Sequence, residues 1–206
     1  MKQTRRNAIK TGIALSAGAI AGCLGGGGSA GETVSSLPSP SLGSSDAPVT
    51  VEGFEDFACS HCRRFALQDL ARLVQEYVQS GDVRYEHHDF PIPVDPKWSW
   101  KAASGARAVQ DTVGDEAFFQ FVVGLYQNMN AYSFELLGTL GEDVGADPEV
   151  VRQAARNETY KPVLEADFSH GRDLGVRGTP TVVVNGSKAK NYRFETVSTL
   201  VEAELA

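Results

Sequence analysis

The chain has 206 residues, of which 42% are hydrophobic and 22% charged, a composition typical of a globular protein rather than a disordered or fibrous one. This length suits a single domain of ordinary size, with or without an insertion. The formal net charge is −7, and the first 22 residues hold four basic side chains and no acidic one, so the remainder carries −11. We do not expect so acidic a chain to bind nucleic acid or an anionic membrane through its surface.

The N-terminus is typical of an export signal. A pair of arginines, Arg5-Arg6, precedes a mildly apolar run over residues 13–21 that is too short to span a membrane. This pattern resembles the twin-arginine signal, and the run ends in a segment that resembles a lipobox, whose cysteine carries lipid after cleavage. We expect residues 1–22 to be the signal peptide and Cys23 the lipid attachment site, the alternative being an ordinary signal peptide in which Cys23 is incidental.

A segment rich in Gly, Ser and Pro follows Cys23. Its few apolar residues cannot bury a core, so we expect residues 23–45 to form a disordered spacer. The folded domain should then begin near Asp46.

The first part of this domain is predicted to form a strand, a helix and a second strand. Residues 48–54 alternate as a strand does, residues 63–79 carry an apolar stripe at helical spacing, and residues 83–90 form a second strand. This order predicts a βαβ unit of a parallel sheet.

Four helices are expected next, in a region over residues 97–174. The first covers residues 98–113; the others begin at Asp115, at Ser133, and at Asp147 followed by Pro148. The fourth is expected to continue to residue 174, with a kink at Pro162.

The chain then returns to strand over residues 179–184, turns at Asn185-Gly186, pairs with a short strand near residues 191–194, and ends in a helix over residues 194–205. The predicted fold class is α/β, in the order βαβ, four helices, ββα.

Cys59 and Cys62 are two residues apart and lie between the first strand and the first helix. A thiol at a helix N-terminus lies beside unpaired backbone N–H groups and the positive end of the helix dipole, which favour the reactive thiolate. One isolated pair is not a structural disulfide framework, so we interpret it as a redox-active dithiol. The alternative is a metal site, for which the chain offers no second CxxC and no HxxxH.

A family resemblance supports the dithiol. Residues 56–65 with the CxxC, together with Val176-Arg177-Gly178-Thr179-Pro180-Thr181 ahead of a hairpin, resemble the DsbA-like thiol–disulfide oxidoreductases over residues 46–206. The resemblance implies a thioredoxin fold with an inserted helical domain. It also implies a cis bond between Thr179 and Pro180, lying against the cysteines, where the Thr179 backbone would pair with an extended client peptide.

The positions of the residues in the CxxC segment predict their roles. Cys59, nearer the helix start, is the expected attacking sulfur, and Cys62 the resolving one. His61 is expected to stabilise the Cys59 thiolate, as in the oxidising members of the family, whereas Ser60 stands where Pro is common. No cofactor and no metal are expected.

The expected function is oxidation of dithiols in exported client proteins by a monomer anchored to the outer face of the cytoplasmic membrane and recycled by a membrane redox partner. A disulfide reductase or isomerase is the alternative, and a copper chaperone that uses the same thiolates is a further one.

Five other side chains are candidates for smaller roles. One of Glu52, Glu55 and Asp56 could exchange a proton with Cys62, although the sequence does not indicate which of them points inward. His87 and His88 alternate along a strand, so they should face opposite sides and cannot form one site together.

Overall fold

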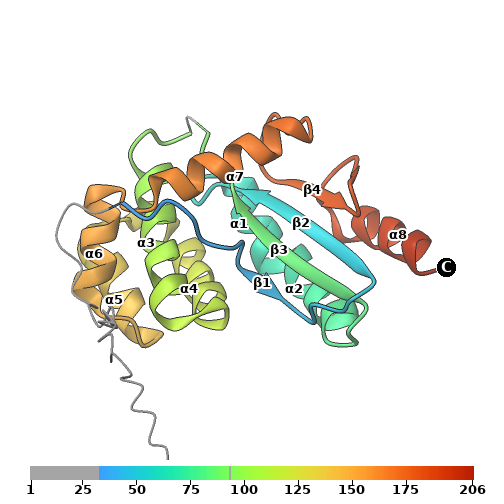
Figure 1. Cartoon of the computed structure of the whole chain (residues 1–206), viewed down its shortest axis with the longest axis horizontal. Helices are drawn as coiled ribbons and strands as arrows, with labels where there is room; N and C mark the ends of the chain where they lie inside the picture. Colours follow the sequence, from blue (N-terminus) through green and yellow to red (C-terminus); the bar gives the residue numbers. More distant parts are fainter. Residues whose placement is uncertain (1–32, 93) are drawn as a thin grey trace, which may run out of the picture.

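The computed structural model describes residues 33–92 and 94–206. Its centre is a five-stranded sheet in the order β1-β3-β2-β4-β5 (Figure 1). The strands are β1 (Ser41–Leu42), β2 (Val49–Glu55), β3 (Val83–Asp89), β4 (Thr181–Val184) and β5 (Ser187–Lys188). β2 and β3 pair in parallel, and β4 runs antiparallel to β2, which is the thioredoxin arrangement that the sequence predicts.

Strand alternation gives the sheet two different faces. Val51 and Tyr85 contribute to a core under the helical segment that follows the CxxC and under α8 (Phe194–Leu205). On the opposite face, Phe54 and Phe90 form a smaller core with Val176 and Val183. α7 (Lys161–Asp173) covers this second face. It can pack closely against the sheet because Gly171 has no side chain that would clash with the Phe54 and Phe90 rings.

The helical segment that follows β2 begins at Ser60, inside the CxxC and three residues earlier than predicted. It consists of α1 (Ser60–Arg64), α2 (Ala71–Leu73) and two π-helical stretches, Phe65–Leu70 and Val74–Val78. The apolar stripe predicted the helix but not its wider turns, which are rare and leave no plain mark on hydrophobic spacing.

Five α-helices, not four, and a short 3₁₀ helix (Met129–Ala131) lie between β3 and β4 in the described residues. The α-helices are α3 (Trp98–Val113), α4 (Asp115–Gln127), α5 (Phe134–Asp143), α6 (Pro148–Asn157) and α7. The prediction of one long final helix is wrong, because the chain leaves the helical conformation at Glu158, whose φ is +52°, and Pro162 then lies in the first turn of α7. Figure 1 shows α3, α4, α5 and α6 grouped beside the sheet, with α7 extending from them over it.

The C-terminal hairpin is tighter than predicted. Val184 pairs directly with Ser187, so the loop holds only Asn185 and Gly186, both with positive φ. This is the two-residue turn that Asn-Gly favours. The expected strand near residues 191–194 is therefore wrong, and β5 lies at Ser187–Lys188.

The predicted boundary of the folded domain is also wrong, because part of the expected spacer belongs to the fold. β1 pairs with the outer edge of β3, and the Val34 amide donates to the Thr159 carbonyl at 2.9 Å. Asp115, expected to cap α4, instead accepts from the backbone amide and the hydroxyl of Ser41. The signal peptide and Cys23 lie outside the described residues, and none of the described helices is long and apolar enough to cross a membrane.

Candidate active site

Cys59 lies at the end of the loop that joins β2 to α1. It is the N-cap residue of α1, in an extended conformation, and its side chain is largely buried, with 6% of the residue exposed. The thiol lies 3.5 Å from the carbonyl oxygen of Thr179, to which it can donate. The sequence prediction of a thiol at a helix start is therefore confirmed.

These surroundings lower the pKa of Cys59 to about 5. The largest cause is the hydrogen bond with the Cys62 thiol, which burial opposes; the Thr179 side chain and the backbone N–H groups of Cys62 and His61 add to the lowering. Each of these groups stabilises the thiolate, so Cys59 carries negative charge at neutral pH once it is reduced.

Cys62 lies one turn into α1 and is completely buried. Its sulfur accepts a weak hydrogen bond from the Asp56 amide at 3.5 Å. Burial raises the pKa of this thiol well above its usual range, and the hydrogen bond to Cys59 and the negative charge of Glu55 raise it further. The two sulfurs of the pair therefore differ strongly in acidity.

The loop before Cys59 is held by Asp56. Its carboxylate accepts 2.8 Å hydrogen bonds from the amides of Ala58 and Ile92. Burial nevertheless raises the pKa of Asp56 to about 6, with a smaller contribution from the charge of Cys59. Protonation of Asp56 should therefore weaken the two hydrogen bonds that hold this loop.

Thr179 and Pro180 are joined by a cis peptide bond, as the resemblance implied. Together with the contact between Cys59 and the Thr179 carbonyl, this confirms that two segments 120 residues apart in the chain meet at the sulfur. The peptide bond precedes β4, so the central sheet positions this loop.

His61 is exposed, and its ring turns toward the loop that follows β5. Its Nδ1 atom lies within hydrogen-bonding distance of the Tyr192 hydroxyl, at 3.2 Å. Its contribution to the pKa of Cys59 comes from its backbone N–H. Tyr192 could not be identified from the sequence, because a lone tyrosine after a hairpin carries no signal of its own.

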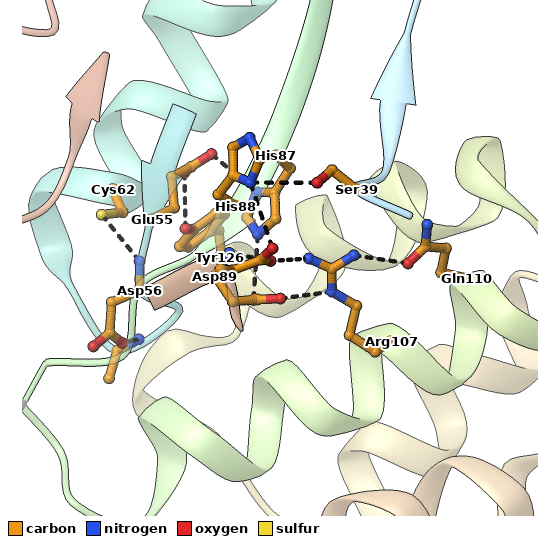
Figure 2. Close-up of polar contacts among 12 residues, drawn as sticks. Ser39, Glu55, Asp56, Cys62, His87, His88, Asp89, Arg107, Gln110 and Tyr126 are labelled. Carbon is orange, nitrogen blue, oxygen red and sulfur yellow. Dashed lines mark hydrogen bonds and ion pairs between the residues drawn. The ribbon is translucent and has the colours of Figure 1, made fainter. Parts of the chain in front are cut away.

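A buried polar network lies behind Cys62 (Figure 2). Glu55 accepts hydrogen bonds from the hydroxyls of Tyr85 and Tyr126, at 2.8 and 2.9 Å. The Tyr85 hydroxyl can reach this carboxylate because Gly53 has no side chain to block it. His87 lies between Glu55 and Asp89, at 3.4 and 3.3 Å.

Arg107 ends this network. Its guanidinium is fully buried and pairs with Asp89 at 2.6 Å and with Asp167. It also donates to the side chain of Gln110 and to the Pro38 carbonyl oxygen in the segment before β1. A continuous chain of polar groups therefore connects the surroundings of Cys62 to the N-terminal segment.

Of the three candidate carboxylates, Glu55 is the one whose charge raises the pKa of Cys62. Glu52 faces the other side of β2, and Asp56 is occupied with the amides of its own loop. His87 and His88 face opposite sides of the sheet, as predicted: His87 contacts Glu55, and His88 contacts Glu52.

Two hollows flank Cys59. One of about 470 Å³ is lined by Ala58, Ser60, Trp98 and Tyr132, among others. The other, of about 330 Å³, is lined by Thr179, Pro180 and Tyr192, among others. The first hollow is thus lined by the two sequence neighbours of Cys59, and the second by the loop whose Thr179 carbonyl oxygen contacts the sulfur.

The comparisons with known proteins agree with this geometry. The family model described as "Thioredoxin" matches residues 35–203. A probable disulfide bond formation protein D of Bacillus cereus is 31% identical over 172 residues, which cover 80% of this chain and 78% of the relative. The chain belongs to the thioredoxin family. The disulfide bond formation protein D of Bacillus subtilis is 28% identical, with 84% of this chain and 82% of that protein covered.

Within the thioredoxin family, the chain is a DsbA-like thiol–disulfide oxidoreductase. The crystal structure of oxidised BdbD from Bacillus subtilis aligns with a TM-score of 0.75 and 26% identity, over 84% of this chain and 98% of that one. DsbA from Chlamydia trachomatis shares the fold, with a TM-score of 0.71 and 19% identity. The match from residue 35 also agrees with the early start of the fold.

Proposed function

We propose that the protein introduces disulfides into exported client proteins through Cys59 and Cys62. The observation that carries this direction is the contrast between the two thiols, one with its pKa lowered to about 5 and the other raised. A stabilised thiolate favours the reduced form of the pair, and a pair that favours its reduced form is a strong oxidant.

The reaction begins with a client thiolate that attacks Cys59 of the Cys59–Cys62 disulfide. A client–Cys59 bond forms, the bond to Cys62 breaks, and Cys62 leaves with the electron pair and takes up a proton, as its raised pKa favours. A second client thiolate then attacks the client sulfur of the mixed disulfide. The client disulfide forms, Cys59 leaves as the thiolate, and two electrons have passed to the protein.

Two features would hold the client during this exchange. The Thr179 backbone beside Cys59 is placed to pair with an extended peptide, as in other strand additions. The hollows on both sides of Cys59 would accept side chains of the client. We assign His61 a supporting role through its backbone N–H and its contact with Tyr192.

Trapping the intermediate tests the assignment of the two sulfurs. In a Cys62→Ala variant, the Cys59 thiolate should attack a client disulfide, bond to one client sulfur and release the other as a thiolate. The resulting mixed disulfide should accumulate, because the resolving thiol is absent. A Cys59→Ala variant is the matched control and should trap none. Mass spectrometry of non-reduced conjugates gives the answer, and conjugates formed equally by both variants would contradict the assignment.

The reduction potential tests the direction of electron flow. In glutathione buffers the pair should titrate well above the potential of about −270 mV typical of thioredoxin and nearer the roughly −120 mV typical of DsbA. A value at the thioredoxin end would favour a reductase or isomerase. Tight, stoichiometric copper binding by the reduced protein without thiol oxidation would favour the metal chaperone.

We further propose that the chain is exported and is anchored by a lipid on Cys23. The twin arginines and the lipobox-like segment support this location, and the extracytoplasmic space allows a disulfide to persist. A redox partner in the membrane would reoxidise the monomeric enzyme. Metabolic labelling with a fatty acid should mark the wild-type chain and not a Cys23→Ser variant; equal labelling of both would exclude this anchor.

A further inference from the structure

Three potential metal ligands meet on the face of the sheet opposite Cys59 and Cys62. They are Glu52 from β2, His88 from the neighbouring β3, and His170 from α7, which covers this face. One ligand atom from each lies within 4.8 Å of the other two. The Glu52 Oε2 atom lies 2.6 Å from His170 Nε2 and 3.1 Å from His88 Nε2.

The His88 ring is held in place for such a role. It stacks on Phe54, with ring centroids 4.8 Å apart and planes inclined by 15°. Its side chain is only 6% exposed, and its Nε2 atom has no well-oriented hydrogen-bond partner among the described residues, although it points at Glu52. A buried ring nitrogen that faces a carboxylate oxygen without a well-oriented hydrogen bond is uncommon in proteins, and a cation bound between the two atoms would satisfy both.

The other nitrogen of His88 already has partners. Its Nδ1 atom lies 3.5 Å from Asp167 Oδ1 and 3.3 Å from the Ser39 hydroxyl. Asp167 is itself fixed by Arg107 and by the Asp89 amide. Metal-binding histidines commonly place a carboxylate on the nitrogen away from the metal, because this partner orients the ring and makes it a better ligand.

The charge around the three ligands also favours a cation. Glu52 and Asp167 bring two carboxylates to this face of the sheet, and the Arg107 guanidinium is shared between Asp167 and Asp89. His170 lies at the outer side of the group, with 45% of its side chain exposed, so an ion and a water molecule could enter from there.

We propose that Glu52, His88 and His170 bind one zinc ion. Two imidazole nitrogens and one carboxylate oxygen are a ligand set that Zn²⁺ accepts in tetrahedral geometry, with the fourth position left to water. Mg²⁺ and Ca²⁺ prefer ligand sets made of oxygen alone. The ion would replace the protons that otherwise join the carboxylate to the two rings.

No metal was expected from the sequence. The role of the zinc ion would be structural. It connects α7, the last helix before the Thr179-Pro180 loop, to the two central strands, one of which leads to Cys59. Because the ion lies on the other face of the sheet, it does not contact the dithiol. The exchange chemistry should therefore proceed with or without it.

The test uses the disulfide form of the protein with Cys23→Ser, so that no free thiolate can bind metal. Competition of Zn²⁺ between the protein and a chromophoric chelator should give one site per chain. Co²⁺, used as a probe, should give the visible absorption of a tetrahedral site without a thiolate charge-transfer band. Zn²⁺ should also raise the melting temperature.

His170 is the exposed ligand, and its substitution tests the zinc site directly. His170→Gln should weaken Zn²⁺ binding by more than about tenfold, since loss of even an outer partner of a metal ligand typically costs about 10- to 100-fold. His61→Gln removes an exposed histidine elsewhere and should leave Zn²⁺ binding unchanged. The His170→Gln variant should still carry out thiol–disulfide exchange, which separates this test from that of the proposed function.

Two results would overturn the proposal. One is the absence of stoichiometric Zn²⁺ or Co²⁺ binding by the disulfide form at micromolar metal. The other is binding that His170→Gln leaves unaltered, or that His61→Gln weakens as much.

Discussion

The two sulfur atoms of the CxxC segment have opposite surroundings although only two residues separate them. Cys59 faces backbone N–H groups and a neighbouring thiol, whereas Cys62 faces the core and the negative charge of Glu55. The first arrangement stabilises a thiolate and the second a neutral thiol. This asymmetry allows Cys59 to remain charged while Cys62 takes up the proton of the reaction.

The lowered pKa of Cys59 predicts how the reduced protein reacts with an alkylating reagent. The rate should rise with pH around a midpoint of about 5 and then stay level through neutral pH, since the thiolate is the nucleophile. Mass spectrometry should place the adduct on Cys59. A midpoint near the usual thiol value, about 8.5, would contradict the electrostatic account.

Glu55 is predicted to accept and return the Cys62 proton. A Glu55→Gln variant should resolve a mixed disulfide on Cys59 more slowly, by about 100-fold if the carboxylate acts as a general base. Removing the charge also eases ionisation of Cys62, but burial, the largest cause of the raised pKa, remains. Rapid-quench measurement of the mixed disulfide at neutral pH checks this.

The control for Glu55 is Tyr126→Phe, which removes one hydrogen bond and keeps the carboxylate. This variant should resolve the mixed disulfide at a rate close to the wild-type rate. If Glu55→Gln were as fast as the wild type, or faster, the carboxylate would have no part in the proton transfer.

At this scale the sequence predicted the residues that carry a motif. The CxxC and the Thr-Pro pair have fixed neighbours along the chain, so Cys59, Cys62, Thr179 and Pro180 could be identified directly. Glu55 was only one of three candidates, because its direction depends on the register of β2 against β3. Tyr192 carried no signal because its contact with His61 exists only in the folded chain.

Among the elements, β1 is the largest departure from the sequence prediction. It has two residues, and it lies in a segment whose composition resembles a linker. Its place in the fold depends on distant partners: the His87 amide donates to the Pro40 carbonyl oxygen, and Arg107 and Gln110 both donate to Pro38. Local composition cannot reveal such pairing, because the partners lie about 50 to 70 residues away.

Truncation should show that this segment is part of the domain. A chain that begins at Asp46 should lose at least about 2 kcal/mol of unfolding free energy relative to one that begins at residue 33. The reason is that several hydrogen bonds, each worth about 0.5–1.5 kcal/mol, are removed and the Arg107 guanidinium loses a buried acceptor. Urea unfolding of the two chains measures the difference, and equal midpoints and slopes would show that the segment is dispensable.

The other differences at this scale arise at helix and strand ends. Glu158 adopts a left-handed conformation that a non-glycine residue seldom takes, so the break between α6 and α7 had no glycine to mark it. Helix starts marked by a cap were predicted well: Ser133 accepts from the Leu136 amide, and Asp147 accepts from the amides of Glu149 and Val150.

For the whole molecule, the pKa of Cys59 makes stability depend on redox state. The reduced protein should melt above the disulfide form at neutral pH by at least about 2–4 °C, the shift that 1 kcal/mol produces in a chain of this size. Since the folded pKa of Cys59 is lowered, its contribution is complete above the unfolded value near 9 and is lost as pH falls toward about 5. The difference in melting temperature should therefore shrink on acidification.

Calorimetry of both redox forms at several pH values checks this dependence. A Cys59→Ser/Cys62→Ser variant, which has neither thiolate nor disulfide, gives the baseline. A disulfide form that melts above the reduced form at neutral pH would argue that the pair is a stabilising crosslink rather than an oxidant.

The inclusion of Val34 in the fold limits how far an anchored domain could travel. Only residues 24–33 separate Cys23 from Val34, and ten residues reach at most about 35 Å when fully extended. The predicted spacer, which ends at residue 45, would have reached roughly 77 Å. A lipid on Cys23 would thus confine the enzyme to a thin layer next to the membrane, where it would meet clients as they emerge from export and before they diffuse away.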